Sequence, residues 1–456
     1  MNIPLFIAVL FLLQILCLYV GKKASKELKT QDDYFLAGRG IRFFPLLMTL
    51  IATQIGGGLV LGSAEEAYKY GWNVLLYPLG ASLGLLALAS GIGKRMSQFK
   101  VSTVAQLFEV VYQSIGLKKV ASGLSIISLF MILIAQVIAS RKFMISLGVD
   151  NEWLFLAFWA IVIVYTVAGG LKAVVATDII QAVFFIVVFL LAFVFTYFSG
   201  IPVAESTALN TETFEFSSTK LCGWLLMPLL FMVIEQDMAQ RCFAAKSGKV
   251  VSLASGVAAV CIMLVCAIPV FYGIAAKTMG LTIPSGGSVF MSAIQATTTP
   301  AIMALVGCAI LAAIISTADS LINAISSNVA QDFDFAWKKK ASSMKISQLI
   351  TTGIGCAAML GSFYASNVVD VLIQSYELSV SCLFVSITAA LFVKKGDSRA
   401  ATYSVTAGAA AFVYFLFIPA TVLPKEVTSV MISAVGYGVG LLQTYLQARQ
   451  KALLEN

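Results

Sequence analysis

One apolar stretch carries a row of polar side chains, and this combination restricts the fold more than any other feature of the chain. Residues 311–332 read LAAIISTADSLINAISSNVAQD, inside a run long enough to cross a bilayer. The polar residues share one helical face; they are Ser316, Asp319, Ser320, Asn323 and Ser327, with Thr317 at its border. Lipid does not accommodate such a face, because polar groups and carboxylates are costly in hydrocarbon. We therefore expect it to point into protein, water or a bound hard cation such as sodium.

The composition is that of a protein embedded in a membrane. Of the 456 residues, 59% are hydrophobic and 11% are charged, whereas an ordinary soluble domain is about a quarter charged. Because each span needs about 20 apolar residues, the length allows roughly a dozen helices with short loops. The sequence therefore predicts an all-α polytopic membrane protein with no soluble catalytic domain.

The absence of histidine narrows the function further. Without it the chain lacks the commonest proton shuttle and metal ligand, and it lacks any serine–histidine or cysteine–histidine nucleophile. The eight cysteines are scattered without a C-x-x-C spacing and are expected to be free thiols. The net charge of +8 lies mainly in short links after alternate apolar stretches, as the positive-inside rule predicts. We expect neither enzymatic activity nor a nucleic-acid partner.

Thirteen membrane spans are predicted, with the N-terminus outside and the C-terminus cytoplasmic. They cover residues 3–20, 43–66, 72–93, 119–147, 151–168, 172–198, 221–243, 250–276, 300–330, 346–365, 368–393, 400–420 and 426–446. This threading puts all but six of the 30 Lys and Arg residues inside, the exceptions being Lys69, Arg141, Lys142, Lys220, Lys277 and Lys425. Residues 103–116 are expected to lie along the inner surface, and 286–300 to form a short outer helix. The predicted location is the cell (inner) membrane.

Two predicted spans contain residues that interrupt a helix. The second reads TLIATQIGGGLVLG, and each glycine costs about 1 kcal/mol of helix propensity; close helix packing through small residues is the alternative. The seventh carries Pro228 and then Glu235 and Asp237. The two spans lie five apart, so each opens one of two five-helix units that run in opposite directions. Interrupted helices at matching positions of inverted halves indicate the central site of a transporter.

The predicted organisation has four segments. They are an N-terminal helix and link at 1–42, a first five-helix repeat at 43–199, an inverted second repeat at 221–393, and two C-terminal helices with a short cytoplasmic tail at 394–456.

Several motifs resemble those of the sodium:solute symporter family. YTVAGGLKAVVATDIIQAVFF at 165–185 is similar to the family signature, DYFLAGRGI at 33–41 to its lead-in to the second span, and EQDMAQRCFAAKS at 235–247 to its Q-R-x-x-A-x-K/R stretch. The resemblance covers about residues 30–400. It implies the inverted-repeat fold of LeuT-type transporters and sodium-driven uptake of a small solute.

The resemblance also implies a sodium site between the second and ninth spans. Its ligands would be the carbonyls of Ala52 and Ile55 together with Ala313, Ser316 and Thr317. The residues themselves agree with this, since unwinding at the glycines frees carbonyls and two adjacent hydroxyls complete a five-oxygen shell. The alternative is that the hydroxyls bond back to carbonyls four residues earlier in their own helix.

A second cation site is suggested by Asp178. Some family members use this aspartate with hydroxyls of the ninth span, where this chain has Asp319 and Ser320. Two alternatives stay open: the two carboxylates could share a proton, or Asp178 could pair with Lys172 or with an arginine of the inner gate.

The substrate site is expected around the glycine run. ATQIGGGLVLGSAEEAY resembles the choline-transporter branch of the family, but Gln54 and Glu235 stand where that branch has tryptophans. Hydrogen bonds and charge would therefore replace cation–π capture, and the expected solute is an amino acid, an amine or a sugar-like molecule. The expected substrate-binding residues are Thr53, Gln54, Gly56, Gly57, Gly58, Glu235 and Asp237.

These features together predict a sodium-coupled symporter, a monomer or weak oligomer in the lipid bilayer. One alternative is a proton-coupled transporter, because Asp178, Asp319 and Glu235 could carry protons. The other is a transporter-like membrane sensor, although the chain ends at QARQKALLEN without an output domain.

Overall fold

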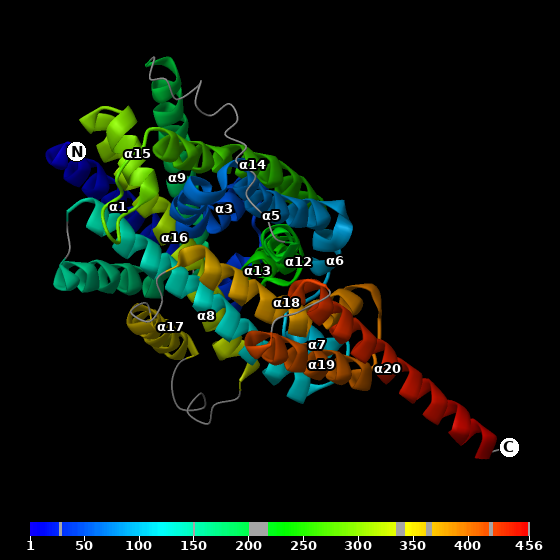
Figure 1. The fold of residues 1–456 in the computed structure, drawn as a ribbon. Coiled ribbons are helices and arrows are strands. Elements are labelled where there is room, and N and C mark those ends of the chain that lie inside the picture. Colours follow the sequence, from blue (N-terminus) through cyan, green and yellow to red (C-terminus); the bar gives the residue numbers. More distant parts are fainter. Residues whose placement is uncertain are drawn as a thin grey trace.

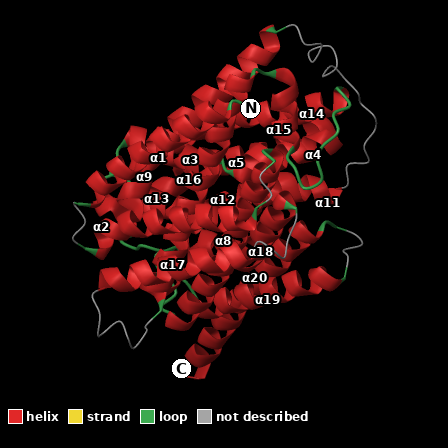
Figure 2. Cartoon of the chain, turned by 90° about the vertical axis from the view of Figure 1, so that its left-hand side faces the viewer, coloured by secondary structure: helices red, strands yellow, loops and turns green. Residues whose placement is uncertain are grey.

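The chain is an assembly of packed helices. The computed structural model describes residues 1–26, 30–148, 151–199, 218–333, 343–361, 367–418 and 423–454, and within these ranges it contains no strand (Figure 2). Nine of the described helices are long and apolar enough to cross a membrane, or ten if one bent pair counts as a single span. The predicted all-helical polytopic class is confirmed. The count of thirteen spans fits the arrangement and stays a prediction.

The helices follow the predicted spans closely. In the first half they are α1 (Ile3–Ser25), α2 (Gln31–Leu36), α3 (Phe43–Gln54), α4 (Ser63–Tyr70), α5 (Leu76–Ala87), α6 (Gly93–Met96), α7 (Gln106–Val110), α8 (Ile115–Ser146) and α9 (Glu152–Phe198). In the second half they are α11 (Ser218–Leu221), α12 (Met227–Ile234), α13 (Gln236–Ala244), α14 (Gly248–Thr278), α15 (Val289–Thr297), α16 (Pro300–Asp332), α17 (Ser343–Gly361), α18 (Val368–Phe392), α19 (Ser398–Phe417) and α20 (Lys425–Leu454). The predicted span ends at 365 and 420 lie outside the described residues, and the four-segment division stays a prediction.

Helix α9 covers two of the predicted spans and changes direction between them. Its non-helical residue is Gly170, with φ 56° and ψ −168°. A Cβ atom there would also lie 2.5 Å from the backbone oxygen of Tyr34. Only glycine combines this backbone conformation with such a close approach.

Both predicted helix interruptions are present. Helix α3 ends at Gln54, and Ile55 leaves the helical region with φ −83° and ψ 81°. Helix α12 ends at Ile234, and the backbone of the next residue, Glu235, is extended with φ −62° and ψ 130°. The helices on either side of Glu235 are bent by 41°.

The glycine run also packs closely against neighbouring helices. It therefore both interrupts the helix and permits close helix packing, the two interpretations that the sequence left open. A Cβ atom at Gly57 would lie 2.3 Å from the Ala139 side chain, and one at Gly58 would lie 2.2 Å from that of Leu372. The broken span can therefore approach α8 and α18 only because these side chains are missing.

Helix α16, which carries the polar row, lies in the interior of the bundle (Figure 1). It contacts α8, α9, α1, α3 and α17, and 83% of the residues in its most apolar 18-residue stretch are buried. Its start is set by Pro300 in the first turn and by the Thr299 hydroxyl, which accepts a hydrogen bond from Ile302 N. By contrast, α19 and α20 pack against each other at the edge, and the C-terminal end of α20 projects from the bundle (Figure 1).

Most of the cations that the threading places outside have local partners. Lys69, Arg141, Lys142 and Lys425 form ion pairs with Glu66, Glu152, Glu65 and Glu377. The ammonium of Lys220 lies 3.3 Å from the centre of the Tyr70 ring. These five cations therefore interact with neighbouring carboxylates or aromatic rings of the protein.

Candidate functional site

The two helix interruptions line the same cavity. Helices α5, α8, α16 and α18 complete its wall. The lining residues are Thr53, Gln54, Gly56, Gly58, Leu59, Tyr77, Ala81, Ile132, Gln136, Glu235, Asp237, Thr317, Leu321, Leu372 and Tyr376. Six of the seven residues expected to bind substrate are among them. Gly57, the seventh, donates its N–H to Gln136 Oε1 at 2.7 Å.

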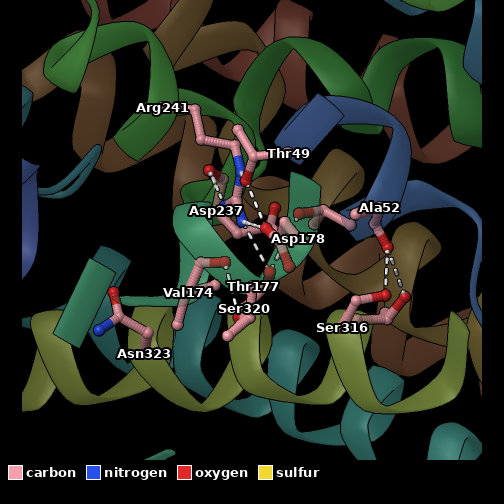
Figure 3. A network of polar contacts seen from close by, with 12 residues as sticks. Thr49, Ala52, Val174, Thr177, Asp178, Asp237, Arg241, Ser316, Ser320 and Asn323 are labelled. Atoms are coloured by element: carbon pink, nitrogen blue, oxygen red, sulfur yellow. Dashed lines mark hydrogen bonds and ion pairs between the residues drawn. The ribbon is translucent and has the colours of Figure 1, made fainter. Parts of the chain in front are cut away.

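Four oxygens of α3 and α16 come together beside this cavity (Figure 3). The Ser316 hydroxyl lies 3.0 Å from the carbonyl oxygens of both Ala52 and Ala313. The Thr317 hydroxyl lies 3.2 Å and 3.1 Å from the same two carbonyl oxygens. We call Ala52, Ala313, Ser316 and Thr317 the neutral cluster. All four residues were expected as sodium ligands from the sequence.

The broken helix explains why the Ala52 carbonyl is available. In a continuous helix it would accept the N–H of residue 56. Here the Gly56 N–H donates instead to the Gln54 carbonyl at 3.0 Å. The freed Ala52 carbonyl is then satisfied by two hydroxyls from another helix, as a buried carbonyl requires. Ile55, the fifth expected ligand, is the residue at which the helix opens.

The neutral cluster has the chemistry of a site for a hard monovalent cation. It is buried, contains only oxygen donors and carries no formal charge of its own. The contacts of Ser316 and Thr317 to Ala313 are also those of the back-bonding alternative. The same contacts let each hydroxyl turn its proton to Ala313 and present a lone pair toward α3.

A second polar group lies one turn further along α16, where Arg241 reaches in from α13 (Figure 3). Its guanidinium donates to the hydroxyls of Thr49 at 2.9 Å and Ser320 at 2.6 Å. It also lies 3.5 Å from an oxygen of Asp178, to which Thr49 donates its hydroxyl proton. We call Thr49, Asp178, Arg241 and Ser320 the charged cluster. Both members of its ion pair are completely buried.

The charged cluster contains one of the partners that the sequence left open for Asp178, an arginine. Asp178 and Ser320, expected at a second cation site, are both in contact with this guanidinium. Asp319 is buried on the intervening turn of α16. The Thr53 and Ser320 hydroxyls lie 3.0 Å apart and connect the charged cluster to the cavity.

The acidic residues of the seventh span face the cavity. Gln54 donates an amide hydrogen to Glu235 Oε2 at 3.2 Å. Asp237 is 1% exposed, and its carboxylate lies beside the Glu235 carboxyl and the Met238 N–H without a cationic donor among the described residues. The Asp237 backbone carbonyl, by contrast, accepts a hydrogen bond from Arg241 at 3.0 Å.

Among the lining residues that the sequence did not predict, three carry polar side-chain atoms: Gln136, Tyr77 and Tyr376. Gln136 is the amide in the apolar run LFMILIAQVIAS, and the argument applied to the polar row of α16 would have singled it out. The hydroxyls of Tyr77 and Tyr376 lie 3.2 Å apart, and the Tyr376 ring stacks on Phe231 with centroids 4.5 Å apart. No sequence signal separated these aromatic residues from ordinary packing residues.

Hydrogen bonds hold α13 against its neighbours on the side of the charged cluster. Gln240 donates to the Phe35 carbonyl at 2.6 Å and to Asn323 at 3.1 Å. Gln236 accepts the Val104 N–H at 2.7 Å and donates to the Ser102 carbonyl at 3.2 Å. This end of the bundle is therefore tied together by side chains from four separate segments.

Comparison with known proteins gives consistent matches. The model of the sodium:solute symporter family matches residues 34–408. The high-affinity choline transporter 1 of Drosophila melanogaster is 26% identical over 388 residues, 79% of this chain and 61% of that protein. The osmoregulated proline transporter of Bacillus subtilis is 27% identical over 40% of this chain and 39% of that protein. The mouse sodium/myo-inositol cotransporter 2 is 29% identical over 40% of this chain, and the match spans only 28% of that relative.

Solved structures share the fold. A Na⁺-coupled sialic acid symporter in a substrate-bound outward-open state superposes with a TM-score of 0.78 at 19% identity, covering 96% of this chain and 97% of that one. A nucleobase-cation-symport-1 family transporter in a closed conformation gives a TM-score of 0.64 at 13% identity, covering 90% and 94%. The architecture is therefore that of the LeuT-type transporters.

Proposed function

The chain belongs to the sodium:solute symporter family, and on this premise we propose that it imports a small organic solute by coupling it to sodium. The observation that carries the proposal is the convergence of the Ser316 and Thr317 hydroxyls on the freed Ala52 carbonyl. We place the protein in the cytoplasmic (inner) membrane, with its N-terminus outside and its C-terminus in the cytoplasm.

In the proposed mechanism, the neutral cluster acts as the ion-dependent contact between α3 and α16. With sodium bound, Ser316 and Thr317 hold α16 against the broken span, which favours the state open to the outside. Thr317 also lines the cavity, so one residue contacts both the ion site and the solute site. When sodium leaves, the two helices separate and the solute is released inside.

The available driving force is sufficient for this coupling. One charge crossing about 100 mV contributes about 2.3 kcal/mol. A tenfold sodium gradient contributes about 1.4 kcal/mol more. One sodium ion can therefore support a several-hundred-fold accumulation of a neutral solute.

Thermal stabilisation by sodium tests the ion site without knowledge of the solute. We expect the melting temperature of the purified protein to rise in NaCl relative to KCl or choline chloride, because the ion binds only the folded state. The double variant Ser316→Ala/Thr317→Ala should lose this rise. Ser327→Ala is the matched control, since Ser327 is equally buried on α16 and its hydroxyl has no partner among the described residues.

The outcome that contradicts the proposal is a sodium-dependent rise that survives in the double variant. Equal stability of the unmodified protein in sodium and potassium would contradict it as well.

A proton-coupled transporter is the second candidate, and the observation in its favour is the pair of buried carboxyl groups, Glu235 and Asp237, which lie within hydrogen-bonding reach of each other. Such a protein would accumulate solute in response to a pH gradient in sodium-free buffer. Sodium-stimulated uptake that persists when the pH is equal on both sides excludes it.

A further inference from the structure

We propose that the solute is an organic cation with N–H donors, an amine or guanidine whose charged group binds between Glu235 and Asp237. This inference rests on the proposed transport function and specifies its substrate class.

The charge around the cavity is the first argument. Glu235 and Asp237 are the only charged residues among those that line it. The cation Arg241 already lies against Asp178, Thr49 and Ser320. Arg241 is therefore one cation beside three carboxyl groups, of which Glu235 and Asp237 are within hydrogen-bonding reach of each other. Uncompensated charge in a buried site is costly, and a cationic solute would supply the missing positive charge.

The hydrogen-bonding capacity of the site is the second argument. Both carboxylate oxygens of Asp237 are buried without a cationic donor among the described residues; beside them lie the Glu235 carboxyl and the Met238 N–H. Glu235 receives a hydrogen bond from Gln54 and is within hydrogen-bonding reach of Asp237. A buried acceptor that lacks its hydrogen bond costs about 1–3 kcal/mol, more when it is charged. A primary ammonium offers three donors to such acceptors, whereas a quaternary ammonium offers none.

The opposite wall of the cavity fits the carbon part of such a solute. Leu59, Ile132 and Leu372 line it together with Tyr77 and Tyr376. The two tyrosine hydroxyls lie 3.2 Å from each other, so they can satisfy one another while their rings face the cavity. A polar and charged side opposite an apolar and aromatic side is suited to a small amine with a short carbon chain.

Neutral sugars and quaternary amines match this site less well. A sugar brings hydroxyl donors but leaves the two carboxylates without a countercharge. Choline brings the charge but places methyl groups, which donate no hydrogen bond, against the carboxylate oxygens of Asp237. The chemistry of the site therefore distinguishes ethanolamine from choline, two molecules that differ in the substitution of the nitrogen.

The experiment is a thermal-shift titration of the full chain in NaCl with a matched panel. The amines are ethanolamine, n-butylamine, putrescine and agmatine, and the comparison compounds are choline, proline and glucose. We expect at least one amine to stabilise the protein and to bind about tenfold or more tightly than choline, since each unmade charged hydrogen bond costs about 1.5–3 kcal/mol. Saturation by choline, proline or glucose with no response to any amine overturns the inference.

Variants locate the binding group. Asp237→Asn should weaken amine binding about tenfold or more, whereas Asp237→Glu should retain part of it. Glu66→Gln is the control, because Glu66 is buried and paired with Lys69 away from the cavity. Unchanged amine affinity in Asp237→Asn overturns the inference. If that variant does not fold, the comparison of amines with choline on the unmodified protein still decides it.

Failure of the inference and failure of the proposed function have different signatures. If sodium stabilises the protein through Ser316 and Thr317 but no amine binds, only the substrate class is wrong. If amines bind equally in NaCl and KCl, and the double variant behaves like the unmodified protein, sodium coupling is wrong. A sodium response that is lost in Asp237→Asn but kept in the double variant assigns the carboxylates to the ion and overturns the inference.

Discussion

The neutral cluster and the charged cluster lie on the same face of α16, four residues and about 6 Å apart along the helix axis. The neutral cluster gathers carbonyl and hydroxyl oxygens from two helices and has no charge of its own. The charged cluster contains hydroxyls too, but it includes both an aspartate and the arginine that compensates it. The comparison teaches that similar side chains on one helix can serve different purposes. A cluster of oxygens without a cationic side chain can bind an ion, whereas in the charged cluster the Arg241 guanidinium already neutralises the carboxylate charge.

The arginine also bears on how many sodium ions the protein uses. A second ion at Asp178, Asp319 and Ser320 would compete with the guanidinium for the same carboxylate and hydroxyl. The second site stays a prediction that requires Arg241 to move away. We therefore propose a single sodium site, at the neutral cluster, for this conformation.

Removal of the Arg241 guanidinium should lower the folding stability more than any other change proposed here. Arg241→Gln leaves the Asp178 carboxylate buried without its cation, and breaking a buried pair in this way costs about 3–5 kcal/mol of folding free energy. A lower melting temperature of the solubilised protein would record it. The double variant Asp178→Asn/Arg241→Gln removes both charges and should recover part of the loss. Purely additive losses would mean that the two residues do not act as a pair.

An added methyl group at the helix break should disturb the neutral cluster. A Cβ atom at Gly56 would lie 2.5 Å from Thr317 Oγ1 and 2.6 Å from Gln136 Oε1. Gly56→Ala should therefore cost about 1–3 kcal/mol through overpacking and reduce the sodium-dependent rise in melting temperature.

The matched control is Gly123→Ala in α8, where a Cβ atom would meet no other atom within 4 Å. It should stabilise the helix by up to about 1 kcal/mol and leave the sodium response unchanged. A full sodium response in Gly56→Ala would show that the ion does not bind at this cluster.

The smallest expected effect is a difference in sodium affinity between variants of the two clusters. Thr317→Ala should weaken sodium binding about tenfold, equivalent to about 1.4 kcal/mol. Asp178→Asn should change it by less than about threefold, under about 0.7 kcal/mol, even though it lowers stability. The measurement is the sodium concentration that gives half of the thermal shift. A larger loss in Asp178→Asn than in Thr317→Ala would assign the ion to the charged cluster.

Features that depend on neighbours along the chain could be predicted from the sequence. The membrane class followed from apolar length, and the helix break in the second span from three consecutive glycines. The break in the seventh span was indicated by Pro228 and the acidic residues after it, although the helix opens at Glu235 and continues past the proline. Pro228 lies just after a π-helical segment, Cys222–Leu226, where the regular α-helical hydrogen bonding is already altered.

Features that depend on which helices become neighbours could not be predicted in the same way. The sequence left Asp178 with several partners, and only packing put Arg241 of α13 beside it. Tyr77 and Tyr376 are separated by 299 positions in the chain, yet their hydroxyls are in contact. Nothing in a single span indicates such a pair, because an aromatic residue in a membrane helix is usually explained by packing alone.

The family resemblance implied which hydroxyls of α16 would lie near the first helix break. The sequence by itself determined that this chain crosses a membrane, where two of its helices break, and which polar residues share one face of α16. Those properties are local, since they follow from apolar length, helix propensity and the periodicity of one helix. Only the tertiary structure decided that the freed Ala52 carbonyl meets Ser316 and Thr317, that Arg241 compensates Asp178, and that the Asp237 carboxylate faces the cavity without a cationic donor among the described residues. The physical reason is that a buried polar group must find its partner across the interior, and the partner is chosen by the packing of distant helices.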